Sequence, residues 1–77
     1  MPDRWDVQPR RSGGWEVQKE GASRASAIAR TQEEAHERAR EFARNAGGGE
    51  VRIKGRDGRI RDSDTIPHAH DPFPPKG

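Results

Sequence analysis

The sequence predicts a small α+β domain, an antiparallel sheet with one helix packed on one face. Short segments alternate apolar and polar residues as half-buried strands do, while one segment repeats its apolar residues at helical spacing. At 77 residues the chain supports a single domain with a thin core, because so short a chain buries only about 60% of its unfolded surface. The predicted order is strand, strand, short third strand, helix, strand, strand over residues 1–62, with a flexible proline-rich tail over 63–77.

The first two strands carry the same Trp-x-Val pattern. Trp5 and Val7 alternate with polar residues, and Trp15 and Val17 do so after the turn-like segment 9–14. An antiparallel hairpin would set Trp5 across from Val17 and Val7 across from Trp15, pairs that contribute roughly 0.2–1 kcal/mol each. Both tryptophans are expected to face the core.

The segment 23–29 favours a third short strand, with two alternatives for its faces. If Ala25, Ala27 and Ala29 face inward, Ile28 faces solvent or a partner. If Ile28 faces inward, the neighbouring arginine and serine share its face. Alternation alone does not choose between these arrangements.

The capping box Thr31-Gln32-Glu33-Glu34 predicts the start of the helix, with the Thr31 hydroxyl accepting from the Glu34 backbone N–H. The Glu34 carboxylate is expected to reach back to Thr31. One apolar stripe follows, formed by Ala35, Ala39, Phe42, Ala43 and Ala46. Gly47 is expected to end the helix, since glycine readily adopts the backbone conformation of a helix stop.

The last two strands are predicted to form a hairpin around Asp57-Gly58, a pair typical of two-residue turns. Such a turn places Val51, Ile53 and Ile60 on the buried face. The other face then carries five cations: Arg52, Lys54, Arg56, Arg59 and Arg61.

These five cations make nucleic-acid binding the leading functional hypothesis. Residues 51–61 hold five bases and one acid, a net charge of +4, whereas the rest of the chain holds ten bases and twelve acids, a net of −2. Several cations on one face can neutralise phosphates and release counterions. One alternative is a solvated or ion-paired surface, with Asp6, Glu16 and Glu20 as the neutralising carboxylates. Another is an acidic protein partner.

Protein association is the second functional hypothesis, because the core is thin for a chain of this length. A homodimer, or an adaptor acting through a sheet face or edge, would place an apolar side chain on the open face. The candidate interface residues are Ile28, Trp5 and Trp15.

Other classes of protein are disfavoured. The chain has no cysteine, which excludes disulfides and thiolate metal sites, and no apolar run of the roughly 20 residues that span a bilayer. A cytoplasmic, non-enzymatic protein without cofactor or membrane contact is expected. His68, His70 and Asp71 have a spacing that could hold a metal, but they lie in the proline-rich tail, and we expect no metal site there.

Several segments, in this order, resemble the bacterial and phage domain of unknown function 2188. They are Trp5-x-Val7, Gly14-Trp15-x-Val17, Glu20-Gly21-Ala22-x-Arg24-Ala25, Thr31-x-x-Glu34-Ala35 and Val51-x-Ile53-x-Gly55-x-Asp57-Gly58-x-Ile60. The resemblance covers about residues 4–61 and implies the α+β fold already expected. It implies no activity, cofactor or site residue.

Overall fold

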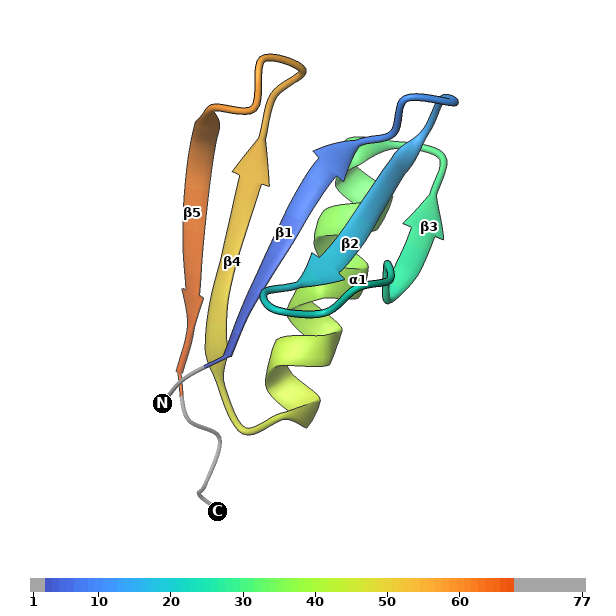
Figure 1. Cartoon of the computed structure of the whole chain (residues 1–77). Coiled ribbons are helices and arrows are strands. Elements are labelled where there is room, and N and C mark those ends of the chain that lie inside the picture. Colours follow the sequence, from blue (N-terminus) through green and yellow to red (C-terminus); the bar gives the residue numbers. More distant parts are fainter. Residues whose placement is uncertain (1–2, 68–77) are drawn as a thin grey trace.

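The computed structural model describes residues 3–67 and confirms the α+β class. Five strands form one sheet, and one helix covers one of its faces (Figure 1). The elements are β1 (Asp3–Pro9), β2 (Trp15–Lys19), β3 (Ala27–Ala29), α1 (Gln32–Asn45), β4 (Gly49–Lys54) and β5 (Ile60–Ile66). The strands lie side by side in the order β3-β2-β1-β4-β5.

The sheet is mostly antiparallel, as predicted, and contains one parallel pairing that the sequence did not indicate. β1 and β4 pair in parallel, with Asp6 across from Arg52 and Val7 across from Ile53, whereas the other three pairings are antiparallel. The chain passes through β2, β3 and α1 between these two strands, so no local turn signals their contact. As a result, the loops that follow β1 and β4 lie at the same end of the sheet (Figure 1).

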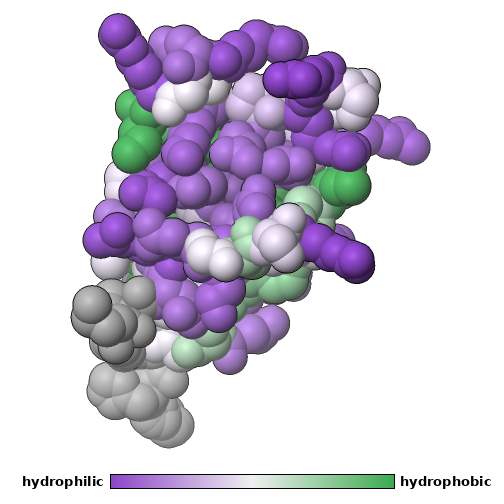
Figure 2. Space-filling view, in the orientation of Figure 1, coloured by the Kyte–Doolittle hydropathy of each residue, from purple (hydrophilic) through white to green (hydrophobic). Residues whose placement is uncertain are grey.

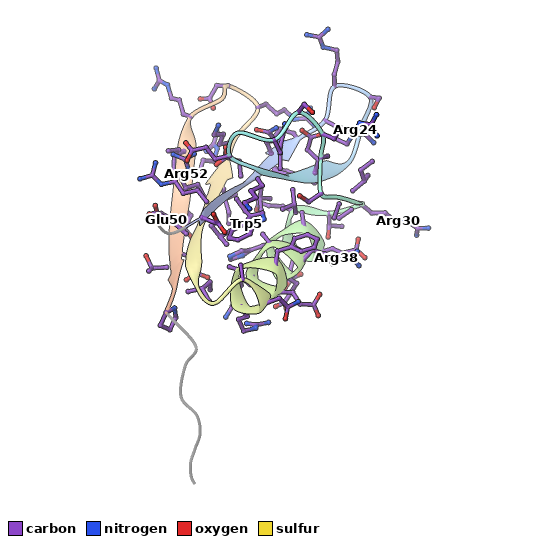
Figure 3. The ribbon with its side chains drawn as sticks, turned by 60° about the horizontal axis from the view of Figure 1, so that its bottom comes forward. Trp5, Arg24, Arg30, Arg38, Glu50 and Arg52 are labelled. Carbon is purple, nitrogen blue, oxygen red and sulfur yellow. The ribbon has the colours of Figure 1, made fainter. Side chains whose placement is uncertain are left out.

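The core lies between the sheet and α1. Its buried members are Trp5, Val7, Val17, Ala29, Ala35, Ala39, Ala43, Val51, Ile53 and Ile66. The helix contributes alanines to this layer, and their small side chains let α1 approach the sheet closely. Trp5 lies between the sheet and α1, whereas Arg52 lies on the opposite, open side of the sheet (Figure 3).

The predicted helix start is confirmed, with one difference in the cap. Thr31 is the N-cap, and its hydroxyl oxygen accepts from the Glu34 backbone N–H at 3.1 Å. The Glu34 carboxylate accepts from the backbone N–H of Arg30 at 3.0 Å, one residue before the position expected. At the other end Ala46 is the C-cap, and Gly47 follows with a φ of 90°.

The third strand forms, and its faces are settled by its pairing with β2. Ala27 and Ala29 lie on the helix side, while Ile28 faces the open side with 60% of its surface exposed. In the first hairpin the faces are as predicted but the pairing is shifted by two residues. Val17 lies across from Val7, and Trp15 across from Pro9. A shift of two residues keeps each side chain on its face.

The second hairpin differs from its prediction by one residue, and this difference reverses a face. The Gly55 N–H donates to the Arg59 carbonyl at 2.9 Å, which closes a three-residue loop over 56–58. Gly58 has a φ of 81° at the third loop position, as this kind of turn requires. Ile60 consequently pairs with Lys54 on the open side, where it is 52% exposed, and does not join the core.

The predicted arrangement of all five cations on one face is therefore wrong. Arg61 is the extra residue of a β-bulge, since Ile60 and Asp62 pair with consecutive residues of β4. Its guanidinium lies against Gly55, which continues the buried alternation of β4 on the helix side. Arg61 is thus separated from Arg52, which faces the open side.

The strand β5 extends past the domain boundary predicted at residue 62. Residues 63–66 pair with β4, and Ile66 is buried. On the helix side, the Asp64 carboxylate lies 3.4 Å from His36 Nε2 and 3.5 Å from Arg40 Nε, which ties β5 to α1. The first part of the predicted tail thus belongs to the sheet, and residues 68–77 lie outside the described chain.

Candidate functional site

Asp6 stands at the centre of the open face and binds two of the five predicted cations. Its carboxylate accepts from Arg52 Nε at 2.9 Å and lies 3.2 Å from Lys54 Nζ. Asp6 and Arg52 are direct partners across the parallel β1–β4 pairing, where opposite charges are favourable. Only 14% of the Asp6 side chain is exposed, so these contacts are weakly screened by solvent.

The ion pairs continue from Arg52 towards the other end of the sheet. Glu20 lies 3.7 Å from both Arg52 and Arg4, and Arg4 lies 3.3 Å from Glu50. Glu50 also accepts from the Ser63 hydroxyl at 3.0 Å. Cations and carboxylates thus alternate along this series of ion pairs, and each charge is neutralised by its neighbours.

The open face is therefore a hydrophilic, ion-paired surface and not a row of free cations. Figure 2 shows this face as mostly hydrophilic, with strongly hydrophobic atoms at its margins. Asp6 and Glu20 act as the neutralising carboxylates suggested by the sequence, whereas Glu16 binds Gln8 and Arg10 instead. Of the five predicted cations, Arg52 and Lys54 are already bound by carboxylates.

A different group of cations gathers at the loop end of the sheet. Arg10 and Arg11 in the β1–β2 loop and Arg56 in the β4–β5 loop line an open hollow of about 260 Å³, together with Pro9. We call these three arginines the loop-end cluster. They come together because β1 and β4 run in the same direction as neighbours, which brings the loops after both strands to one end (Figure 1).

The loop-end cluster is largely without anionic partners. Arg10 lies 3.6 Å from Glu16, but within residues 3–67 no ion pair joins Arg11 or Arg56 to a carboxylate. Arg59 lies in the same hairpin and is 87% exposed, with only a 4.0 Å contact to Asp57. Guanidinium groups with free donors suit a phosphate or carboxylate, which they can bind with two parallel hydrogen bonds.

The family model for an uncharacterised protein conserved in bacteria (DUF2188) matches residues 5–66, most of the chain. The chain belongs to the DUF2188 family. No curated protein and no solved structure matches it. Membership confirms the resemblance noted in the sequence and assigns no activity, so the function of this DUF2188 domain must be argued from its surface.

Sequence reasoning identified one member of the cluster, Arg56, and missed the other two. Arg10-Arg11 stands in a turn-like segment, and an adjacent basic pair in a loop is the signal that could have drawn attention to it. Its nearness to Arg56 depends on the β1–β4 pairing, which joins residues more than 40 positions apart.

The candidate interface residues are separated by the fold of this DUF2188 domain. Trp5 is buried beneath α1, and Trp15 is half-buried against the core, so both face the helix side. Ile28 faces the open side at the β3 edge, whereas the exposed Ile60 lies at the opposite edge, on β5. These side chains do not form one apolar patch.

Within the described residues, no group of three or more histidine, cysteine or acidic side chains is arranged to hold a metal ion. The cluster of His68, His70 and Asp71 lies outside them. The same residues include no helix with the length and apolar character needed to cross a membrane.

Replacing Asp6 by alanine is expected to lower the free energy of unfolding by about 1–3 kcal/mol, because Arg52 and Lys54 would lose their shared carboxylate. Urea unfolding followed by circular dichroism measures this loss. Glu37→Ala is the matched control, since its exposed carboxylate makes only a 4.0 Å contact to Arg40, and it should cost less than about 0.5 kcal/mol. Equal losses in the two variants would show that the Asp6 contacts contribute little.

Proposed function

We propose that this protein is a non-enzymatic nucleic-acid-binding module that contacts backbone phosphates through its loop-end cluster. The observation that carries the proposal is the convergence of Arg10, Arg11 and Arg56 from two loops around one open hollow. Phosphate contacts by arginine require no base-reading geometry, and their free energy comes mainly from counterion release. A cytoplasmic location is consistent with such a ligand.

The proposed surface differs from the row of five cations that the sequence alone suggested. Arg52 and Lys54 are not available to a phosphate, because both already bind the Asp6 carboxylate and the phosphate would have to displace it. Arg56 and Arg59 remain at the hairpin tip, and Arg10 and Arg11 supply charge from the neighbouring loop. The contact is therefore made at the end of the sheet.

A protein-binding adaptor or homodimer is the second candidate function. It is favoured by Ile28, which is well exposed on the edge strand β3. An acidic protein partner could also bind the loop-end cluster. The nucleic-acid assay below separates these functions, because an adaptor gives no salt-dependent binding to nucleic acid.

The test measures the affinity for a labelled 20-base-pair DNA duplex by fluorescence anisotropy between 50 and 200 mM salt. Three phosphate contacts predict a slope of log K against log salt of about −2.7, a loss of about 40-fold over this range. Arg56→Ala should weaken binding at 50 mM salt and reduce the slope by about 0.9. The mutated side chain lies in an exposed loop, so the fold should be retained.

Two further variants make this result specific. Arg38→Ala removes the same charge from α1 (Figure 3), on the covered side of the sheet, and should leave the slope unchanged. Lys54→Gln removes a cation that Asp6 already binds, and should also leave it unchanged. A slope that responds to Lys54 but not to Arg56 would assign binding to the open face, and an affinity independent of salt would end the proposal.

A further inference from the structure

We infer that the loop-end cluster prefers the two-stranded form of its ligand, a nucleic-acid duplex, over single strands of the same sequence. This inference rests on the proposed function and specifies its ligand. It follows from what surrounds the arginines, from the positions of the aromatic side chains and from the physics of phosphate binding.

Proteins that bind single strands usually offer aromatic faces on which bases stack, a contribution of about 1–3 kcal/mol per base. Among residues 3–67 Trp5 is buried between the sheet and α1, and Trp15 and Phe42 are partly buried against the same core. The hollow itself is lined by three arginines and Pro9. None of the described residues that line the hollow is aromatic, and Trp15, the aromatic residue paired with Pro9, faces the helix side.

Amide side chains are the other groups that commonly hold unpaired bases, because they match the hydrogen-bonding edges of those bases. Gln8 lies on β1, which leads into the β1–β2 loop, and Gln18 lies near the far end of β2, which leaves it; both are already engaged. Gln8 donates to Glu16 at 2.7 Å, and Gln18 donates to the Ala22 carbonyl at 2.7 Å. The end of the sheet thus offers charge and little base recognition.

A flexible single strand loses conformational entropy when it binds, and without base stacking only its phosphate contacts offset this loss. A duplex is already stiff, with a persistence length of about 150 base pairs, so its phosphates are presented at fixed spacing. Counterion release also favours it, since each neutralised phosphate contributes a salt slope of about −0.9 on a duplex and about −0.7 on a single strand. Arginines from two separate loops can use phosphates held in such a fixed array.

The expected preference can be stated as a ratio. For three contacts the two slopes are about −2.7 and −2.1. If duplex and single strand bind equally at 1 M salt, this difference makes the duplex about six-fold tighter at 50 mM salt. Double-stranded DNA and double-stranded RNA share the relevant chemistry, so each is a separate arm of the experiment.

The experiment competes unlabelled nucleic acids against the labelled DNA duplex, using the full-length protein at 50 and 200 mM salt. The competitors are the DNA duplex, the RNA duplex of the same sequence and each separated strand, at equal phosphate concentration. The inference predicts that at least one duplex competes about six-fold better than its own strands at 50 mM salt. It also predicts that Arg11→Ala and Arg56→Ala narrow this ratio, whereas Arg38→Ala does not.

Single strands that compete as well as both duplexes, with Arg56→Ala still weakening every ligand, would overturn the inference and leave the proposed function standing. Absence of binding to any nucleic acid at 50 mM salt would instead overturn the proposed function, and the inference with it. Circular dichroism of each variant confirms that the sheet is intact, so a lost affinity reports on the arginine and not on unfolding.

Discussion

Replacement of Trp5 by alanine is expected to lower the free energy of unfolding by about 3–5 kcal/mol. A domain of 77 residues has a total of only about 4–12 kcal/mol, so this loss would remove a large share of its stability. Urea unfolding followed by far-ultraviolet circular dichroism measures the loss. If the variant is too unstable to give a folded baseline, its thermal midpoint is measured at increasing concentrations of a stabilising osmolyte, and the loss is obtained by extrapolation to zero osmolyte.

The size of this effect follows from the composition of the core. Trp5 is 4% exposed, and the other buried members of its core are alanines, valines and two isoleucines, which are too small to fill the space its ring would leave. Lys19 adds a cation–π contact at 5.8 Å from the ring centre. Ile60→Ala is the control, because this large apolar residue is half exposed and should cost less than about 0.5 kcal/mol. A loss below 1 kcal/mol for Trp5→Ala would contradict the packing described.

The second large effect is expected for Gly49→Ala, which should destabilise the protein by about 1–3 kcal/mol. A Cβ atom at this position would lie 2.7 Å from the Asp3 carbonyl oxygen and 2.7 Å from the Trp5 ring. Asp3 is the partner of Gly49 in the parallel pairing, so its carbonyl cannot withdraw without disturbing the junction of β1 and β4. Thermal and urea unfolding both measure the change.

Gly55→Ala is the matched control, at the residue that follows the same strand. An added Cβ there would meet only the side chain of Arg61, which can swing into solvent. The loss should stay below about 1 kcal/mol, because the entropy lost by the unfolded chain partly offsets it. Similar losses in the two variants would mean that the sheet adjusts to a methyl group at Gly49, and that the β1–β4 junction is less tightly packed than its distances indicate.

Features that depend on a few consecutive residues were predicted well from the sequence. The Thr31 cap, the glycine helix stop and the inward alanines Ala35, Ala39 and Ala43 each arise from contacts within one or two turns, so the local pattern determines them. Ala46, also predicted in this stripe, is exposed because it is the C-cap. The inward faces of β1 and β2 were also correct, because a period of two assigns each side chain to a face whatever its partner is. For β3 the alternation left two arrangements open, because its alanines and isoleucine are all apolar, and pairing with β2 selected the one with Ile28 on the open side.

Pairing registers were not determined locally, and their errors had unequal consequences. In the first hairpin a shift of two residues changed partners and preserved faces. In the second, a three-residue loop and a bulge at Arg61 shifted the strand by one residue, which moved Ile60 to the open side and Arg61 away from Arg52. The Asp-Gly pair is compatible with either loop, and the packing of the whole sheet selects between them.

By itself, then, the sequence determined the class of fold, the helix, the faces of β1, β2 and β4, and a surplus of arginine near residue 56. Only the tertiary structure decided which cations are free. It placed β4 beside β1 in parallel, so that Asp6 binds Arg52 and Lys54 while Arg10 and Arg11 meet Arg56 at the loop end. The physical reason is that the attraction between two charges weakens as their separation grows, and short separations between residues far apart in the chain are created only when the strands assemble.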